Sequence, residues 1–304
     1  MKRTLLTALA GLLVAVALPA QETVSSTARI EAENRAALSS HAAQVTVVAT
    51  RKVPRRDFQL WYGHLTDGSW AADGNWYPRE TTELIFSRPG ADGTQDIVRS
   101  VPLDTIWSQP EPVCAEAAAP GNQIFPMVSP DGQRLYFAAD SLFGMGGYDL
   151  YVANWDPQKK AWGHVQNMGC PFNSPGDDLL FCETPDGRYS VFASNRDCGP
   201  DEVIIYVLQQ EVAVQRPVSP DEATALMHLP VTAPDNGYPF EKQPLGKTPD
   251  IRFFDPSPVE DVVKPDKSAK AAKASAGKKD KKTTKKTKKD PPVKVVDEKV
   301  KIVK

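Results

Sequence analysis

Gln123-Ile-Phe-Pro-Met-Val-Ser-Pro-Asp-Gly-Gln-Arg-Leu-Tyr-Phe-Ala-Ala139 decides the fold, because Asp177-Asp-Leu-Leu-Phe-Cys-Glu-Thr-Pro-Asp-Gly-Arg-Tyr-Ser-Val-Phe-Ala193 repeats its pattern. In each copy two apolar and aromatic runs flank a Ser/Thr-Pro-Asp-Gly tetrapeptide. A fainter third copy lies upstream, with Glu83-Leu-Ile-Phe-Ser87 followed by Asp96-Ile-Val-Arg99. Short strands that repeat every ~50 residues are typical of the blades of a β-propeller.

The tetrapeptide suits a tight turn between two strands. A hydroxyl residue first, proline second and glycine fourth are the preferences of a type I turn, and Val, Ile, Tyr and Phe in the flanking runs favour strands. We therefore predict one blade with strands at 123–129, 134–139, 148–155 and 162–168. The next blade has strands at 177–183, 189–194 and 202–208. In the first blade, 75–80 is predicted to pair with 83–87.

Five strings carry a resemblance to a known family: Ser129-Pro-Asp-Gly132, Leu135-Tyr-Phe-Ala138, Gly146-Gly-Tyr-Asp-Leu-Tyr151, Asn173-Ser-Pro-Gly-Asp-Asp178 and Phe192-Ala-Ser-Asn-Arg196. The chain resembles TolB-type, WD-like β-propeller repeat proteins, in the version that Bacteroidota export to the cell envelope. The match is specific over 122–207 and weak over 75–115. The chain departs from the family in having about three blades, where propellers have about 4–8, and a lysine-rich tail where an OmpA-like domain often follows.

We therefore predict an all-β, propeller-like array of about three to four four-stranded blades with a disordered C-terminal tail. The predicted domains are 1–20, a signal peptide; 21–44, an N-terminal segment with a short helix over 28–43; 45–215, the propeller-like domain (blades about 75–115, 122–168 and 173–210); 216–263, a proline-rich extension; and 264–304, the lysine-rich tail. Three blades cannot close a ring, so 45–77, 211–262 or a partner chain is expected to complete it. Within 45–77, Val45–Val48 is a candidate strand.

The first 20 residues have the parts of a secretory signal: Lys2 and Arg3, an apolar run from Leu5 to Leu18, and the small-residue end Pro19-Ala20. The apolar run is shorter than the ~20 residues that a membrane span needs. We therefore expect a protein that is periplasmic or associated with the cell envelope, without a transmembrane segment in the mature chain.

Export would place Cys114, Cys170, Cys182 and Cys198 in an oxidising compartment, where four cysteines allow two disulfides. Three pairings are possible. Cys170–Cys198 is favoured because both residues lie in predicted loops of one blade, whereas Cys182 lies in a strand. Because the chain has no Cys-x-x-Cys or His-x-His spacing, no metal site is predicted. No other cofactor is predicted either.

Opposite charges divide the chain. Residues 264–304 have a net charge of +11, whereas residues 21–263 have a net charge of −15. The block Lys278–Lys289 cannot bury enough apolar surface to fold. In an exported protein it is not expected to bind nucleic acid, and an anionic envelope surface, an acidic partner or no fixed partner are the alternatives. The last segment, with Val293–Val296 and Val300–Val303, alternates enough to add a strand to an exposed sheet edge.

Nine prolines between positions 217 and 258 exclude a regular core strand or a long helix from the extension. The sequence Ser219-Pro220-Asp221-Glu222 predicts a short helix through Met227. The rest of the extension is expected to pack over the propeller, with Phe240, Phe253 and Phe254 as its anchors.

In a propeller, the loops between second and third strands and the links between blades open on one face. The predicted loops gather a polar ring there, a candidate ligand or partner site: Asn122, Asp140, Asn173, Asp177, Asp178, Asn195 and Arg196. A competing interpretation, which we favour, is structural, since Asp and Asn in loops often bond the nearby backbone. A structural role is also predicted for Asp131, Gly132, Asp149, Asp186, Gly187 and Asp201.

The familiar motifs of enzymes are absent from the sequence, including Gly-x-Ser-x-Gly, the Walker loop and the dinucleotide fingerprint. Asp177 and Asp178 make a poor catalytic pair because adjacent strand residues point to opposite faces. We therefore predict a non-catalytic module that mediates protein–protein interaction in the cell envelope. Two alternatives stay open: a protein that binds glycan or peptidoglycan fragments through the aromatic residues of 58–77, and a hydrolase with an unrecognised site.

Overall fold

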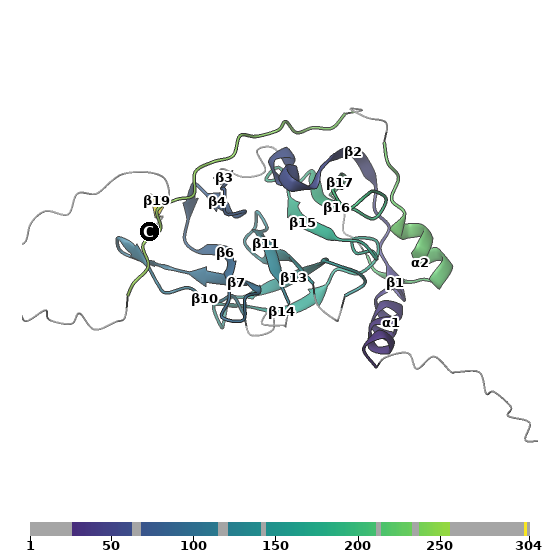
Figure 1. Ribbon diagram of the computed structural model, residues 1–304, viewed down its shortest axis with the longest axis horizontal. Helices are drawn as coiled ribbons and strands as arrows, with labels where there is room; N and C mark the ends of the chain where they lie inside the picture. The colour runs from purple at the N-terminus through teal and green to yellow at the C-terminus, as the bar shows by residue number, and fades with distance from the viewer. Residues whose placement is uncertain are drawn as a thin grey trace, which may run out of the picture.

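The computed structural model describes residues 26–62, 68–114, 121–140, 144–210, 214–232, 237–255 and 301–302. The predicted signal peptide and most of the lysine-rich tail lie outside these residues. The described part of the protein is mostly β, and its three larger sheets are antiparallel (Figure 1). Within this part, no helix has the length and apolar character that a membrane crossing requires.

The second sheet has the four strands predicted from the repeat. Its order is β11-β12-β13-β14, with bounds β11 (Gln123–Val128), β12 (Arg134–Ala139), β13 (Asp149–Asp156) and β14 (Ala161–Asn167). Each bound lies within one residue of its prediction. The hairpin pattern of the sequence therefore predicts this sheet almost completely.

The tetrapeptides form the predicted turns. The N–H of Gly132 donates to the carbonyl of Ser129 (2.8 Å), and the N–H of Gly187 donates to the carbonyl of Thr184 (2.9 Å). Both glycines have positive φ, 69° and 67°, which costs glycine little and other residues more. The hydroxyl of Ser129 donates to Asp131 Oδ1 (2.5 Å) and that of Thr184 to Asp186 Oδ1 (2.6 Å). These bonds lower the pKa of both carboxyls and support the structural role predicted for them.

The third sheet takes its fourth strand from the N-terminal part of the chain. Its order is β15-β16-β17-β2, with bounds β15 (Asp178–Glu183), β16 (Tyr189–Ser194), β17 (Glu202–Gln209) and β2 (Val47–Pro54). β2 runs antiparallel to β17, from Glu202 opposite Pro54 to Leu208 opposite Val47. The segment 45–77 therefore completes the third sheet, and the described residues form no fourth sheet of three or more strands.

The first sheet has three strands, in the order β10-β7-β6: β6 (Leu84–Pro89), β7 (Gln95–Ser100) and β10 (Glu111–Pro112). The predicted pairing of 75–80 with 83–87 is wrong, because β4 (Trp76–Pro78) pairs with β3 (Gly68–Trp70). The side chain of Asn75 takes the place of a strand instead. Its Nδ2 donates to the carbonyl of Ser87 (3.0 Å) and its Oδ1 accepts from the N–H of Ser87 (2.8 Å).

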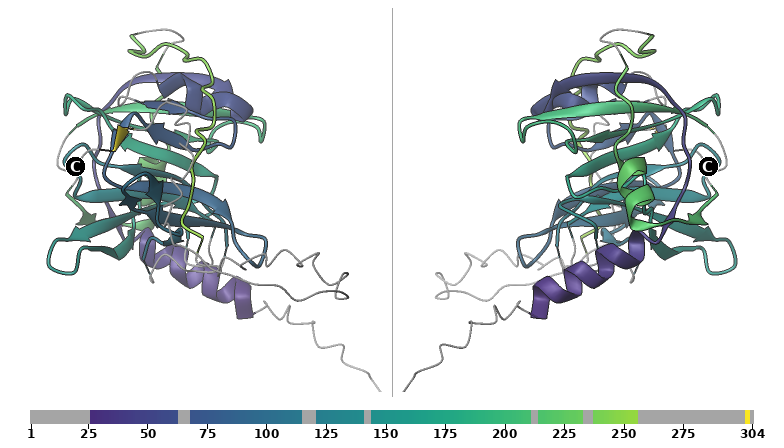
Figure 2. Two further views of the ribbon diagram at one scale, coloured as in Figure 1. Left: turned by 90° about the vertical axis from the view of Figure 1, so that its left-hand side faces the viewer. Right: turned by 90° about the vertical axis from the view of Figure 1, so that its right-hand side faces the viewer.

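The three sheets pack against one another in chain order. β11 contacts β6 on one side and β15 on the other, and Figure 2 shows the sheets as successive layers. Between the second and third sheets, the rings of Tyr136 and Phe181 lie 4.5 Å apart. The hydroxyl of Tyr136 also donates to Glu183 Oε1 (2.6 Å). The second sheet is therefore covered by a neighbouring sheet on each side, as expected for repeated sheets that are stable only when stacked.

Short elements close the side of the third sheet. Helix α1 (Ser26–Leu38) leads to β1 (His41–Ala42), which pairs with β18 (Arg216–Pro217). The predicted helix after the third sheet is present as α2 (Pro220–Met227), and Ser219 caps it by accepting from the N–H of Glu222 (3.2 Å). A kinked 3-10 segment, η1 (Arg55–Tyr62), follows β2 and packs on β17.

Residues 237–255 cross the molecule from the α2 side to the first sheet (Figure 1). The N–H of Gly246 donates to the carbonyl of Trp70 (2.7 Å). Near the end of this segment, Phe253 stacks on Phe86, and it lies beside β9 (Ile106–Trp107), which pairs with β8 (Pro102–Leu103). Phe240 also packs on the core, but Phe254 is 47 % exposed. Phe254 is therefore not an anchor. In an extended chain successive side chains point to opposite sides, so Phe254 points to solvent when Phe253 points to the core.

The predicted Cys170–Cys198 disulfide is not formed, and none of Cys114, Cys170, Cys182 and Cys198 is joined in a disulfide. The sulfur of Cys170 lies 3.5 Å from the carbonyl oxygen of Ala223 in α2, and that of Cys198 lies 3.2 Å from the carbonyl oxygen of Glu202. Burial raises the pKa of Cys170 to about 11. The two thiols therefore face different elements, which their shared position in loops could not reveal.

The end of the tail pairs with the chain over two residues, but the pair is a two-stranded sheet of its own, and the predicted addition to the edge of a larger sheet is not seen among the described residues. β19 (Lys301–Ile302) pairs in parallel with β5 (Glu80–Thr81). Figure 1 places this pair at the end of the molecule that carries the β3–β4 hairpin. The last residues of the chain therefore meet a segment that lies just before the first sheet.

Candidate functional site

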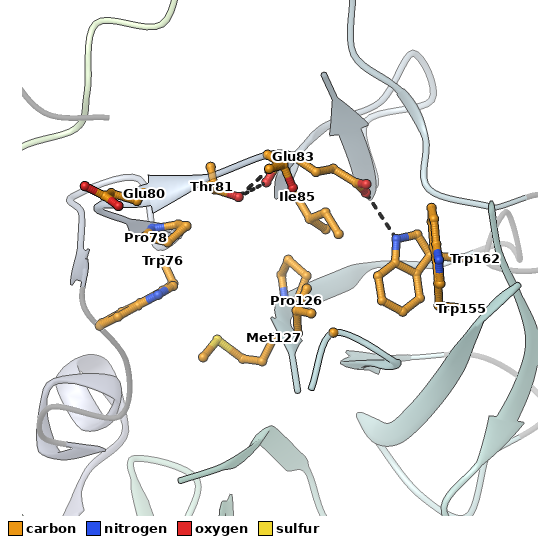
Figure 3. A pocket seen from close by; sticks show the side chains of 13 residues that line it. Trp76, Pro78, Glu80, Thr81, Glu83, Ile85, Pro126, Met127, Trp155 and Trp162 are labelled. Atoms are coloured by element: carbon orange, nitrogen blue, oxygen red, sulfur yellow. Dashed lines mark hydrogen bonds between the residues drawn. The ribbon is translucent and has the colours of Figure 1, made fainter. Parts of the chain in front are cut away.

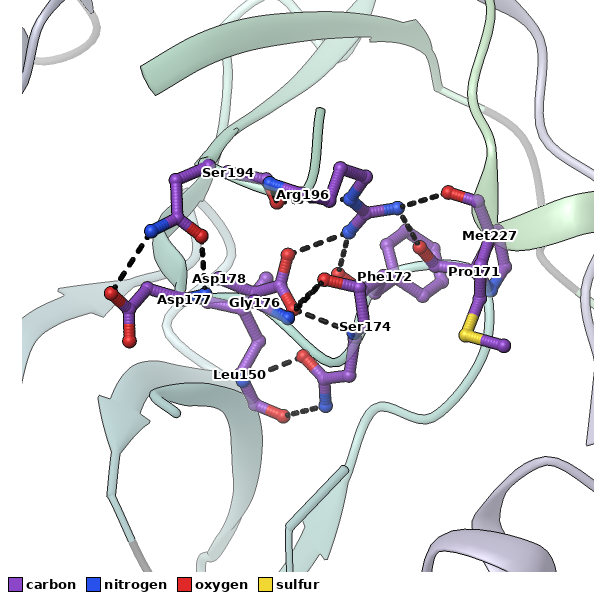
Figure 4. A network of polar contacts seen from close by, with 12 residues as sticks. Leu150, Pro171, Phe172, Ser174, Gly176, Asp177, Asp178, Ser194, Arg196 and Met227 are labelled. Carbon is purple, nitrogen blue, oxygen red and sulfur yellow. Dashed lines mark hydrogen bonds and ion pairs between the residues drawn. The ribbon is translucent and has the colours of Figure 1, made fainter. Parts of the chain in front are cut away.

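The polar ring lies at one end of the strands, where two of its members close the third sheet (Figure 4). Asp177 precedes β15 and Asn195 follows β16. The N–H of Asp177 donates to Asn195 Oδ1 (2.6 Å), and Asn195 Nδ2 donates to Asp177 Oδ2 (3.2 Å). The backbone N–H of Asn195 also donates to the carbonyl of Asp177 (3.1 Å). We call such an Asp–Asn pair, bonded through side chains and backbone, a clasp.

The second sheet has the same clasp with the two residue types exchanged. Asn122 Nδ2 donates to Asp140 Oδ2 (2.8 Å), and the N–H of Asp140 donates to the carbonyl of Asn122 (3.1 Å). Each clasp also reaches back to the preceding sheet. Asn122 Oδ1 accepts from the N–H of Gln95 (3.1 Å), and Asp177 Oδ1 accepts from the N–H of Tyr148 (3.0 Å). The clasps therefore join strands within a sheet and also join one sheet to the next.

Arg196 and Asp178 form a buried ion pair beside the clasp of the third sheet. Their side chains are 4 % and 0 % exposed, and Arg196 Nη2 lies 2.6 Å from Asp178 Oδ1. Arg196 also donates to the carbonyls of Pro171 (2.7 Å), Phe172 (2.6 Å) and Met227 (3.0 Å). One guanidinium thus ties β15, the turn after Cys170 and the end of α2 together.

Asn173 and Asp149 bond the backbone in the neighbouring loops. Asn173 accepts from the N–H of Leu150 (2.7 Å) and donates to its carbonyl (2.9 Å). Asp149 Oδ2 accepts from the N–H of Met145 (2.5 Å), which holds the preceding loop as predicted. Burial raises the pKa of Asp149 to about 6. Asp201 differs: it is exposed, and its backbone carbonyl, which accepts from the N–H of Arg55 (2.9 Å), makes the contact in place of its carboxylate.

All seven members of the polar ring therefore bond other groups of the chain. The structural interpretation of the ring accounts for its contacts, and the ligand-binding role stays a prediction. A residue from outside the repeat also contacts the polar ring. Arg55 of η1 forms an ion pair with Asp177, at 2.5 Å from Arg55 Nη1 to Asp177 Oδ2. The sequence could not place this residue, which comes from the N-terminal part of the chain.

A groove of about 570 Å³ opens at the other end of the strands, between the first and second sheets (Figure 3). Its wall on the side of the first sheet runs from β4 through β5 to β6. Its opposite wall comes from β11 and the adjoining ends of β13 and β14. The residues that line it include Trp76, Pro78, Glu80, Pro126, Trp155 and Trp162. Gly132, in the first Pro-Asp-Gly turn, also lines it. We call this site the tryptophan groove.

Three tryptophans set the chemistry of the groove. Trp155 and Trp162 are opposite each other on β13 and β14, with ring centroids 5.2 Å apart and planes at 63°. Trp76 packs edge-on against Trp70, at 5.4 Å between centroids. Such rings offer large apolar faces and an indole N–H that needs a partner. Trp155 and Trp76 are half-buried, so the walls present aromatic surface to the opening.

Acidic side chains accompany the tryptophans. Glu83 crosses the groove, because its Oε1 accepts from Trp162 Nε1 (3.1 Å), as Figure 3 shows. Arg99 lies 4.0 Å from the same carboxylate oxygen and 3.5 Å from Glu111. Glu80 is exposed at the rim. Aromatic faces beside carboxylates suit a ligand that carries apolar and basic groups together.

The sequence missed most of this groove. From the aromatic segment 58–77, Trp76 reaches it, whereas Phe58, Tyr62 and Trp70 are buried in the core. Trp155 and Trp162 carried a usable signal. They flank the short turn that joins two predicted strands, and residues in that position face each other across the pair.

Comparison with protein-family models gives no match for this chain, and comparison with curated proteins gives none either.

Proposed function

We propose that the protein is a non-catalytic binding module of the cell envelope, and that its tryptophan groove takes an extended segment of a partner protein. One observation carries this proposal. The groove adjoins β5, and β5 pairs with an added strand along its backbone edge. A site that combines a strand edge with side-chain pockets is suited to an extended peptide.

When a peptide binds by strand addition, its backbone and its side chains contribute differently to binding. Main-chain hydrogen bonds along the sheet edge supply affinity for any extended segment, and pockets for alternate side chains supply specificity. Tryptophans at the centre of an interface often dominate its binding free energy. In the tryptophan groove, β5 would supply the first contribution and Trp76, Trp155 and Trp162 the second.

The wider setting of the proposal comes from the sequence. The repeat supports blades of the TolB-like type, which we propose the three sheets to be, although they do not by themselves make a ring. The apolar run after Lys2 and Arg3 supports export to the periplasm or the cell envelope. In that setting the polar ring would hold the sheets together. The tryptophan groove, at the opposite end of the strands, would then be the site where a partner binds.

The aromatic faces also favour one second candidate, a glycan or peptidoglycan fragment. Sugar rings stack on tryptophan, and carboxylates such as Glu80 and Glu83 can accept hydroxyl protons. This ligand would use Trp155 and Trp76 but would have no need of the backbone edge of β5. Binding of soluble muropeptides to the full chain, without binding of any peptide, would favour this candidate over the first.

A random-peptide library selected on the full chain tests the proposal. We expect the selected peptides to lose about 30-fold in affinity for the Trp155→Ala variant, since a tryptophan anchor contributes about 2 kcal/mol or more. Trp61→Ala is the matched control, because Trp61 lies outside the groove and packs on Arg51. The affinity of the selected peptides for Trp61→Ala should stay within about two-fold of their affinity for wild type. Selected peptides that bind wild type and Trp155→Ala equally, with both variants folded by thermal melting, would contradict the proposed site.

A further inference from the structure

The end of this chain lies at the wall of the tryptophan groove. Lys301 is opposite Glu80 and Ile302 is opposite Thr81 in the parallel pair. Glu80 and Thr81 both line the groove. The strand that occupies the edge of β5 therefore belongs to the C-terminal segment of the same chain.

The sequence of that segment fits the chemistry of the groove. Lysine and apolar residues alternate over Lys299–Ile302, so an extended backbone would place Lys299 and Lys301 on one side and Val300 and Ile302 on the other. The region 264–304 carries a net charge of +11. Glu80 and Glu83 stand on the groove wall, and the remainder of the chain is acidic. Long-range attraction between the two parts would concentrate the tail near the groove.

The connecting chain is long enough for this return. The described extension ends at Asp255, just after Phe254 bonds the carbonyl of Trp107 through its N–H (2.7 Å). From there, residues 256–300 lead to Lys301. If these residues behaved as a random coil, about 45 of them would have a typical end-to-end distance of roughly 40 Å. A ligand tethered at that range has an effective concentration near the millimolar level.

We propose that the segment Val293–Val303 is the resident ligand of the tryptophan groove, and that a partner enters by displacing it with a segment of the same kind. That kind is an extended strand that combines lysines with apolar residues, which alternate over Lys299–Ile302. The inference rests on the proposed function, because it names the ligand class of the same groove. Its consequence is that the free chain is partly closed to partners.

The test compares full chains that differ only in the tail. The probe is a fluorescein-labelled synthetic peptide of residues 292–304, and binding is measured by anisotropy. The variant K301P/I302P removes the two N–H groups that a strand can donate at the pairing positions. The matched control, K288P/K289P, places the same substitutions in the tail outside the paired strand. We expect K301P/I302P to bind the probe at least ten-fold more tightly than wild type, and the control to bind it like wild type.

Two results would overturn the inference, and they differ in what they leave standing. Equal affinity for all three chains would mean that the tail does not occupy the groove, although the groove would still take such a segment. No binding to any of them would mean that this segment is not its ligand. In either case the library-selected peptides and Trp155→Ala decide the proposed function separately.

Discussion

Replacing Arg196 with methionine is expected to lower the free energy of unfolding by about 3–5 kcal/mol. The substitution leaves Asp178 buried, with 0 % of its side chain exposed, and without its charged partner. It also removes the donor to the carbonyls of Pro171, Phe172 and Met227. Breaking a buried ion pair by removing one partner is costly because the remaining charge stays desolvated. The loss should therefore be far larger than the loss of a surface charge.

Urea unfolding followed by circular dichroism measures this loss. Arg188→Met is the matched control, because Arg188 lies beside the same sheet and pairs with Asp186 at 3.7 Å, but both side chains are more than half exposed. An exposed pair contributes about 0–1 kcal/mol. Losses of similar size in the two variants would show that Arg196 is not the centre of this corner of the fold.

Removing β2 is expected to abolish cooperative unfolding and to cause aggregation. A chain that begins at residue 55 lacks β2, so β17 becomes an edge strand. Residues Val203–Leu208 of β17 are at most 3 % exposed in the intact protein. A long, apolar edge is a template for pairing with other chains. The chain should therefore be soluble only when another strand covers β17.

The control for this deletion is a chain that begins at residue 45. It loses α1 and β1, including the bond from Arg35 Nε to the carbonyl of Met145 (2.7 Å), but it keeps β2. We expect it to stay monomeric and to melt in a single transition. Thermal melting and analytical ultracentrifugation of the two chains check the prediction. If both behave like the control, β2 is not required to complete the third sheet.

The strands of the second and third sheets could be predicted because their signals are local. Ser129–Gly132 and Thr184–Gly187 fix each hairpin within a few residues, and the flanking apolar runs set its length. α2 was predictable for the same reason, since Ser219 and Pro220 mark its start. Residues that are neighbours in the sequence determine the turns and the helix cap, so both could be predicted from the sequence alone.

The remainder depended on contacts between distant segments. β2 and β17 lie far apart in the sequence, and nothing in either strand's sequence indicates that the two pair. Asn75 replaces a strand with a side chain, which no strand pattern predicts. The sequence also could not show that Asn122 bonds Asp140 or that Arg196 bonds Asp178. The groove was missed because Trp155 and Trp162 read as ordinary strand residues.

The most direct test of the central claim asks at which end of the strands a peptide binds. A peptide of residues 292–304, with benzoylphenylalanine in place of Ile302, is photo-crosslinked to the full-length K301P/I302P chain and mapped by mass spectrometry. Our account predicts crosslinks within 76–85, 126–132 and 155–162, which contain the two walls of the tryptophan groove. Crosslinks confined to 122, 140, 177–178 and 195–196 would place binding at the polar ring and contradict it.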